Sequence, residues 1–139
     1  MRLVLDANIL VSGPLSAEGP PGKLVAAWLD RRFVLVTPAE QIEELRRVLA
    51  YAKLRPFAGG AQARDFVENL EALAELAEDL PEIQASLAPD GNLILATAVA
   101  GGVDAVVSGG LAGMLVLGSV GSNSIVTARQ AVERLGLSD

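Results

Sequence analysis

The chain has 139 residues, of which 11 are basic and 17 acidic, and its formal net charge at pH 7 is −6. It contains no histidine and no cysteine. These two absences exclude a Ser-His-Asp or Cys-His nucleophile, a histidine general base, a Cys/His zinc site and disulfide bonds. Enzymatic chemistry would have to use carboxylates, hydroxyls, Lys, Arg or the backbone, and hard divalent cations are the first cofactors to consider.

Length and composition are typical of one globular domain spanning residues 1–139. No apolar run reaches the roughly 18 residues that span a bilayer. Asp6 and Asn8 interrupt the apolar stretch at residues 1–13, which is unlike a signal peptide. We therefore expect a soluble, cytoplasmic protein with no membrane contact.

Short apolar runs alternate with helical patterns in the first half of the chain. We predict a strand at Leu3–Leu5, a loop between segments 12–14 and 19–22, a helix at Lys23–Asp30 and a strand at Phe33–Val36. Thr37, Pro38 and Glu40 then match a capping box. The sequence therefore predicts a helix from Pro38 to about Ala50.

The same alternation continues in the second half. We predict an irregular segment at 51–60, a helix over 61–80 ended by Leu80-Pro81, a turn at 89–92, a buried helix at 92–100, strands at 105–107 and 124–126, and a helix capped by Thr127 and running to Leu135. Strands that alternate with helices predict a three-layer α/β/α fold with a central parallel sheet of four to five strands.

Charge is unevenly distributed along the chain. Residues 61–80 carry six acidic residues and one basic residue, and the spacing of Phe66, Leu70 and Leu73 predicts an amphipathic helix with a charged, solvent-facing side. Residues 23–55 carry seven basic and four acidic residues, which could meet phosphates or be ordinary surface bases. Five aromatic residues offer few platforms for base stacking.

Polar residues follow the first predicted strand, where ligands bind in open α/β sheets. Asp6 ends that strand, and Asn8 and Ser12 come next. A carboxylate at a buried strand end has to be paired, hydrogen-bonded or metal-bound. Asp6 is therefore a candidate cation ligand, and the alternative is that it caps the following helix.

The helix after Pro38 offers a second carboxylate. At about 100° per residue, Glu44 flanks the apolar face, whereas Glu43 points away from it and has Arg47 four residues on. Glu44 is therefore the candidate that could turn toward a site, and an ordinary boundary glutamate is the alternative. Ser108-Gly109-Gly110 could also expose backbone N–H groups to an anion, but no nucleotide-binding pattern surrounds this turn.

Five motifs occur in one order along the chain: Leu5-Asp6-Ala7-Asn8 with Ser12, Thr37-Pro38 into a Glu44-Leu45 helix, Pro89-Asp90-Gly91-Asn92 with Ile94 to Ala98, Asp104 to Gly110, and Ile125-Val126-Thr127. Together they resemble the PIN domain, in particular the toxin components of bacterial and archaeal toxin–antitoxin pairs. The resemblance implies a cluster of acids that binds Mg²⁺ or Mn²⁺ and endoribonuclease activity on single-stranded RNA. It also implies a homodimer and inhibition by a cognate antitoxin protein.

Two acids of the family carry over onto this chain. Asp6 and Glu44 match catalytic, metal-binding positions, so the resemblance assigns them those roles. Accessory polar positions of the family are matched by Asn8, Ser12 and Ser108.

The other two family acids are missing. Glycine occupies both positions, Gly91 before the Ile94 helix and Gly110 after the third predicted strand, 105–107. Asp90 could replace the acid at Gly91, or serve in the turn or as a helix cap. Asp104 precedes that strand, roughly 13 Å from its carboxyl end, and cannot replace an acid at Gly110.

A site with two carboxylates, and a third if Asp90 turns in, favours at most one weakly held Mg²⁺ or Mn²⁺. We therefore expect ribonuclease activity that is reduced or lost. The alternative is a non-catalytic binding module that engages an antitoxin-like partner or RNA.

Overall fold

The computed structural model describes residues 1–15, 19–49, 60–81, 89–108, 119–120 and 123–137. Its sheet has the strand order β3-β2-β1-β4-β6-β5. The strands are β1 (Arg2–Leu5), β2 (Val34–Thr37), β3 (Glu75–Leu76), β4 (Ala105–Val107), β5 (Ser119–Val120) and β6 (Asn123–Val126). The strands β3, β2, β1, β4 and β6 pair in parallel, and β5 adds to the edge in the antiparallel sense. The predicted parallel sheet is confirmed, although the two-residue strands β3 and β5 were not predicted.

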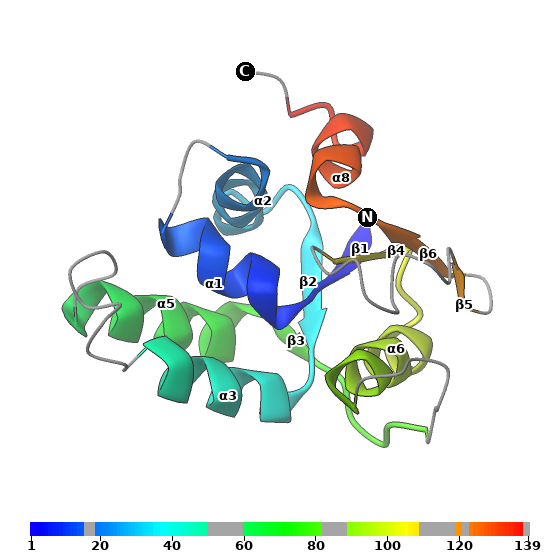
Figure 1. Ribbon diagram of the computed structural model, residues 1–139, viewed down its shortest axis with the longest axis horizontal. Helices are drawn as coiled ribbons and strands as arrows, with labels where there is room; N and C mark the ends of the chain where they lie inside the picture. Colours follow the sequence, from blue (N-terminus) through cyan, green and yellow to red (C-terminus); the bar gives the residue numbers. More distant parts are fainter. Residues whose placement is uncertain (16–18, 50–59, 82–88, 109–118, 121–122, 138–139) are drawn as a thin grey trace.

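Helices cover both faces of this sheet (Figure 1). They are α1 (Ala7–Leu15), α2 (Pro20–Leu29), α3 (Ala39–Leu49), α5 (Gly60–Leu73), α6 (Pro89–Gly101) and α8 (Ala128–Arg134). Side chains alternate across β1, so Leu3 and Leu5 pack with α1, α2, α3, α5 and α8, whereas Val4 packs with α6. The three-layer α/β/α architecture is therefore confirmed.

The predicted loop around residues 12–22 is wrong at both ends. Residues 12–14 belong to α1, and Pro20 and Pro21 open α2 instead of preceding it. Proline is favoured at the first helical positions, because the missing N–H has no partner there. Gly13 serves packing and not a turn: a Cβ at this position would lie 2.4 Å from Val25 Cγ2 and 3.2 Å from the Pro21 carbonyl oxygen.

The variant Gly13→Ala is expected to lower the free energy of unfolding by about 1–2 kcal/mol, because overpacking outweighs the better helix propensity of alanine. Urea unfolding measures this loss. Val25→Ala removes the methyl group that the new Cβ would meet, so the double variant should lose less than the two single variants together. Strict additivity would contradict the proposed contact.

Other helix limits also differ from the predictions. Thr37 ends β2, and α3 begins at Ala39. Residues 89–92 form the first turn of α6, because a Pro-Asp start suits a helix as well as a turn. The capping box at Thr127 is confirmed: its hydroxyl accepts from the Gln130 N–H, and the Gln130 side chain accepts from the Thr127 N–H. The irregular segment predicted at 51–60 lies almost wholly outside the described residues.

The acidic helix is shorter than predicted. It ends at Leu73, and the chain then joins the free edge of β2 as β3, where Glu75 lies opposite Val36. Backbone pairing to the sheet thus overrides a segment of high helix propensity. The six acids between residues 65 and 79 are exposed, as predicted.

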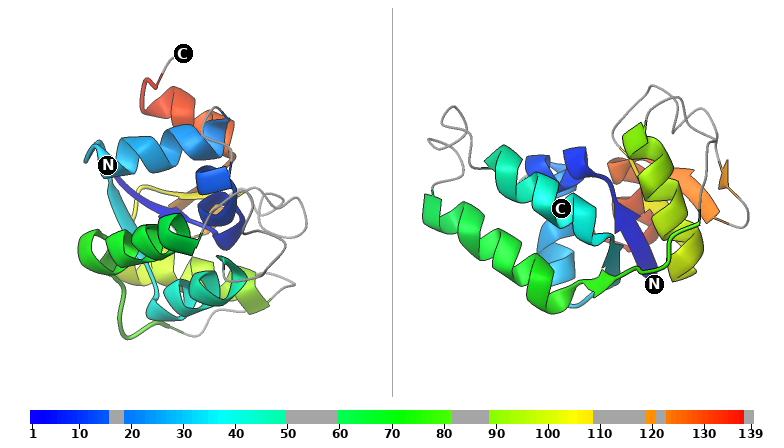
Figure 2. Two further views of the ribbon diagram at one scale, coloured as in Figure 1. Left: turned by 90° about the vertical axis from the view of Figure 1, so that its left-hand side faces the viewer. Right: turned by 90° about the horizontal axis from the view of Figure 1, so that it is seen from below.

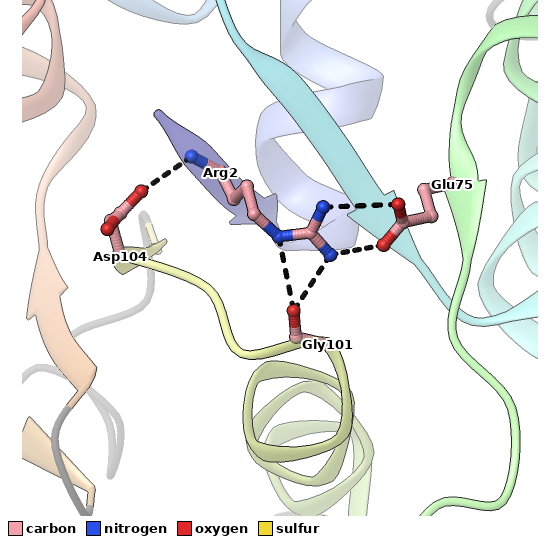
Figure 3. Close-up of polar contacts among 4 residues, drawn as sticks. All are labelled: Arg2, Glu75, Gly101 and Asp104. Atoms are coloured by element: carbon pink, nitrogen blue, oxygen red, sulfur yellow. Dashed lines mark hydrogen bonds and ion pairs between the residues drawn. The ribbon is translucent and has the colours of Figure 1, made fainter.

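Arg2 ties together three elements at the amino edge of the sheet (Figure 3). Its guanidinium donates to the Gly101 carbonyl at the end of α6, with Nη2 at 2.8 Å, and pairs with the Glu75 carboxylate of β3. Its backbone N–H donates to Asp104 Oδ2 at 2.7 Å. Asp104 therefore lies at the start of β4, away from the carboxyl edge, as the sequence predicted.

The Arg2 hydrogen bond holds the pKa of the Glu75 carboxyl below its usual range. A lowered pKa means that the pair stabilises the fold above the unfolded-state pKa, and that this contribution is lost as pH falls through the folded value. Both side chains are substantially exposed, so we expect Glu75→Gln to cost less than about 1 kcal/mol at neutral pH, and less in acid, where Glu75 becomes protonated. Urea midpoints at neutral and at acid pH test this, with Glu78→Gln as the control.

Candidate functional site

Asp6 stands at the carboxyl end of β1, and its backbone and side chain are both held in place. Its N–H donates to the Val107 carbonyl of β4 at 3.0 Å. Its carboxylate accepts from the Ile9 N–H at 3.0 Å and from the Ser108 hydroxyl at 2.7 Å. Only 8% of Asp6 is exposed. The capping alternative is therefore correct in geometry, because Asp6 caps the first turn of α1, and the same carboxylate lies where a ligand would bind.

Ser108 follows β4 directly, so parallel pairing brings it beside Asp6. Its backbone N–H donates to the Val126 carbonyl of β6 at 3.0 Å. The Ser108 hydroxyl therefore orients the Asp6 carboxylate. The Ser108 N–H, one of the backbone groups that the sequence offered to an anion, pairs within the sheet instead. The family resemblance placed Ser108 at an accessory polar position, and in the structure its hydroxyl contacts Asp6.

Gln41 is a buried polar residue that sequence reasoning missed. It lies on α3 with 3% exposed, and its amide donates to the Leu5 carbonyl at 2.9 Å and to Thr37 Oγ1 at 3.1 Å. It therefore joins α3 to the carboxyl ends of β1 and β2. A signal was present, since Gln41 shares the apolar stripe of Leu45 and Val48 at helical spacing.

Glu44 is half-buried on α3, whereas Glu43 is exposed, as the helical pattern predicted. Glu44 comes three positions after Gln41, so the two side chains leave neighbouring points on one side of the helix. The predicted partner of Glu43 is wrong: Glu43 pairs with Arg46, which also pairs with Glu71 of α5. Glu43 pairs with Arg46 and not with Arg47 because Arg46 can contact the carboxylates of Glu43 and Glu71 at the same time.

Asn8 and Ser12 both lie on α1, the helix that Asp6 caps. Asn8 is exposed and Ser12 half-buried, and a spacing of four residues places them on one side of the helix. Both residues follow Asp6 in the sequence, on the helix that begins directly after it.

Gly91 lies in the first turn of α6. The last residue of that helix meets Arg2 at the amino edge of the sheet, and a helix of 13 residues is about 20 Å long. The right-hand view of Figure 2 shows α6 standing beside β1. The start of α6 is therefore directed toward the carboxyl edge, where Asp6 lies.

The structure places one of the two remaining named residues. Asp90 is the second residue of α6, as that helix is bounded. Gly110 lies outside the described residues.

The resemblance implies Mg²⁺ or Mn²⁺, and the described residues show which side chains could bind such an ion. No group of three or more acidic side chains suited to a metal occurs in the described ranges. Within them, each buried side-chain nitrogen and oxygen also has a hydrogen-bond partner. The carboxylates of Asp6 and Glu44 are hard oxygen donors, and Mg²⁺ commonly takes one or two of these and keeps its waters. The donor chemistry of Asp6 and Glu44 therefore suits a single, largely hydrated ion, but within the described residues no third acid joins them.

Comparison with known proteins gives one family. The PIN domain family model matches residues 2–112, which is most of the chain. No curated protein and no solved structure matches the chain significantly. In the part of the chain that the structure describes, no helix is long and apolar enough to cross a membrane. With its parallel sheet and with Asp6 at the carboxyl end of β1, the chain belongs to the PIN domain family.

Proposed function

We propose that this PIN domain is a cytoplasmic relative of the toxin ribonucleases of toxin–antitoxin pairs whose metal-dependent cleavage of single-stranded RNA is weakened or lost. The observation that carries the proposal is the Asp6 carboxylate, fixed by the Ile9 N–H and the Ser108 hydroxyl at the carboxyl edge. The start of α6, directed toward the same edge, carries Gly91, which has no side chain to bind metal.

The chain's own residues have defined parts in such a site. Asp6 and Glu44 would hold Mg²⁺ or Mn²⁺, and Ser108 keeps the Asp6 carboxylate in one orientation. A divalent ion supplies Lewis acidity and a nucleophilic water when bound. With only the two carboxylates of Asp6 and Glu44 we expect the ion to bind weakly, because the affinity for such ions rises with the number of charged ligands.

One observation favours a non-catalytic binding module as the second candidate. Both Asp6 oxygens already accept hydrogen bonds from the protein, so internal donors compensate the buried charge without a metal. Such a module would form a homodimer and engage an antitoxin-like protein or RNA without cutting it. The exposed acids of residues 65–79 would suit a basic partner segment.

An RNA cleavage assay tests the proposed function. The purified chain is incubated with a labelled single-stranded RNA in Mg²⁺, in Mn²⁺ and in a chelator. We expect little or no cleavage above the chelator background. Fast metal-dependent cleavage would contradict the loss of activity, whereas RNA retention without cleavage in a gel-shift assay would favour the binding module.

A further inference from the structure

We infer that Gln41 is the positioning residue that sets Glu44 relative to Asp6. This inference rests on the proposed function, because it concerns the same two acids. It adds a residue that neither the acid pattern nor the family resemblance assigns.

The peptide unit between Leu5 and Asp6 is held at both of its polar atoms. Its carbonyl, which belongs to Leu5, accepts from the Gln41 amide at 2.9 Å. Its N–H, which belongs to Asp6, donates to the Val107 carbonyl at 3.0 Å. Because both ends of this unit are fixed, the Asp6 Cα cannot shift without breaking one of these bonds.

The two contacts come from opposite sides of β1. Val107 lies on β4 and acts through the sheet. Gln41 lies on α3, and its second N–H donates to Thr37 Oγ1 at the end of β2. One amide therefore fastens the start of α3 to two neighbouring strand ends.

Glu44 follows Gln41 by three residues on the same helix, a rise of about 4.5 Å. A rigid helix fastened at Gln41 carries Glu44 in a fixed direction from Asp6. Gln41 is also buried, so water cannot substitute for its two contacts. Loss of the amide should therefore loosen the spacing of the two carboxylates before it unfolds the domain.

The test compares Gln41→Met, which keeps the length and apolar stem but removes both donors, with Ile42→Val. Ile42 is the next residue on α3, is buried, and belongs to the hydrophobic core. It therefore serves as a matched control for a general loss of packing. Thr37→Val is a second variant, which removes one acceptor of the amide and leaves its bond to Leu5.

The first readout is the dissociation constant for Mn²⁺ alone, followed by water-proton relaxation. Removing a group bonded directly to a metal ligand typically weakens metal binding by about 10–100-fold. Gln41 bonds to the backbone next to Asp6 and not to its carboxylate, so we expect Gln41→Met to weaken binding by about tenfold, at the lower end of that range, and Thr37→Val to weaken it less. Ile42→Val should stay near the unaltered value. Equal affinities in Gln41→Met and Ile42→Val would overturn the inference.

The second readout needs no metal. Hydrogen exchange of the Ile9 amide reports on the Asp6 cap, and it should quicken by about tenfold in Gln41→Met relative to Ile42→Val. If the unaltered chain binds no Mn²⁺ at all, the metal part of the proposed function fails, and the Ile9 exchange alone decides for or against Gln41.

Discussion

Replacing Trp28 with alanine is expected to lower the free energy of unfolding by about 3–5 kcal/mol, which is a large part of the stability of a typical domain. Trp28 lies on α2 and is only 3% exposed. Its ring meets Phe66 of α5 edge to face, with centroids 6.4 Å apart and an interplanar angle of 89°. Alanine would leave a cavity between helices that are far apart in the sequence.

Far-UV circular dichroism in urea is the appropriate measurement, because Trp28 is the single tryptophan and its fluorescence disappears in the variant. Trp28→Phe keeps an aromatic ring and should lose clearly less than Trp28→Ala. A loss below about 1 kcal/mol for Trp28→Ala would show that the site collapses around the smaller residue and that the packing described is not tight.

Restoring both missing acids, as Gly91→Asp with Gly110→Asp, is expected to tighten Mn²⁺ binding by about 100-fold or more, since ligand charge tunes such affinities. Gly91 lies in the first turn of α6, where a carboxylate is also favoured by the helix dipole. Without metal the double variant should be less stable than the unaltered chain, because the added carboxylates repel Asp6.

The rise in melting temperature at saturating Mn²⁺ measures this gain. A matched control, Ala26→Asp with Ala100→Asp, adds the same charge at two exposed helical positions. An equal Mn²⁺-induced rise in both double variants would show a general charge effect. No rise in the restored variant would undermine the assignment of Gly91 and Gly110 as acid positions.

Much of the site was predictable because its residues come directly after predicted strands. Asp6 and Ser108 each come directly after a short apolar run, and parallel pairing of β1 with β4 makes such residues neighbours. The burial of Glu44 relative to Glu43 followed from helical geometry. The contribution of Gln41 was not predicted, because its partners Leu5 and Thr37 lie on two different strands and become its neighbours only in the fold.

The parts of the fold that were mispredicted depend on contacts between distant segments. Gly13 looks like a turn residue, but it is needed because α2 packs closely against α1 at that point. Strand β3 has only two residues, and they lie inside a stretch that favours helix. It forms because its backbone pairs with the edge of β2 and because Glu75 pairs with the guanidinium of Arg2. Neither partner is visible in a local pattern.

We propose that this PIN domain has too few carboxylates at its strand ends to hold a divalent ion tightly. A calorimetric titration of the unaltered chain with Mn²⁺ tests it most directly. We expect weak binding, with little or no heat at micromolar concentrations. Tight binding by the unaltered chain, abolished by Asp6→Asn, would contradict it, because two carboxylates would then suffice.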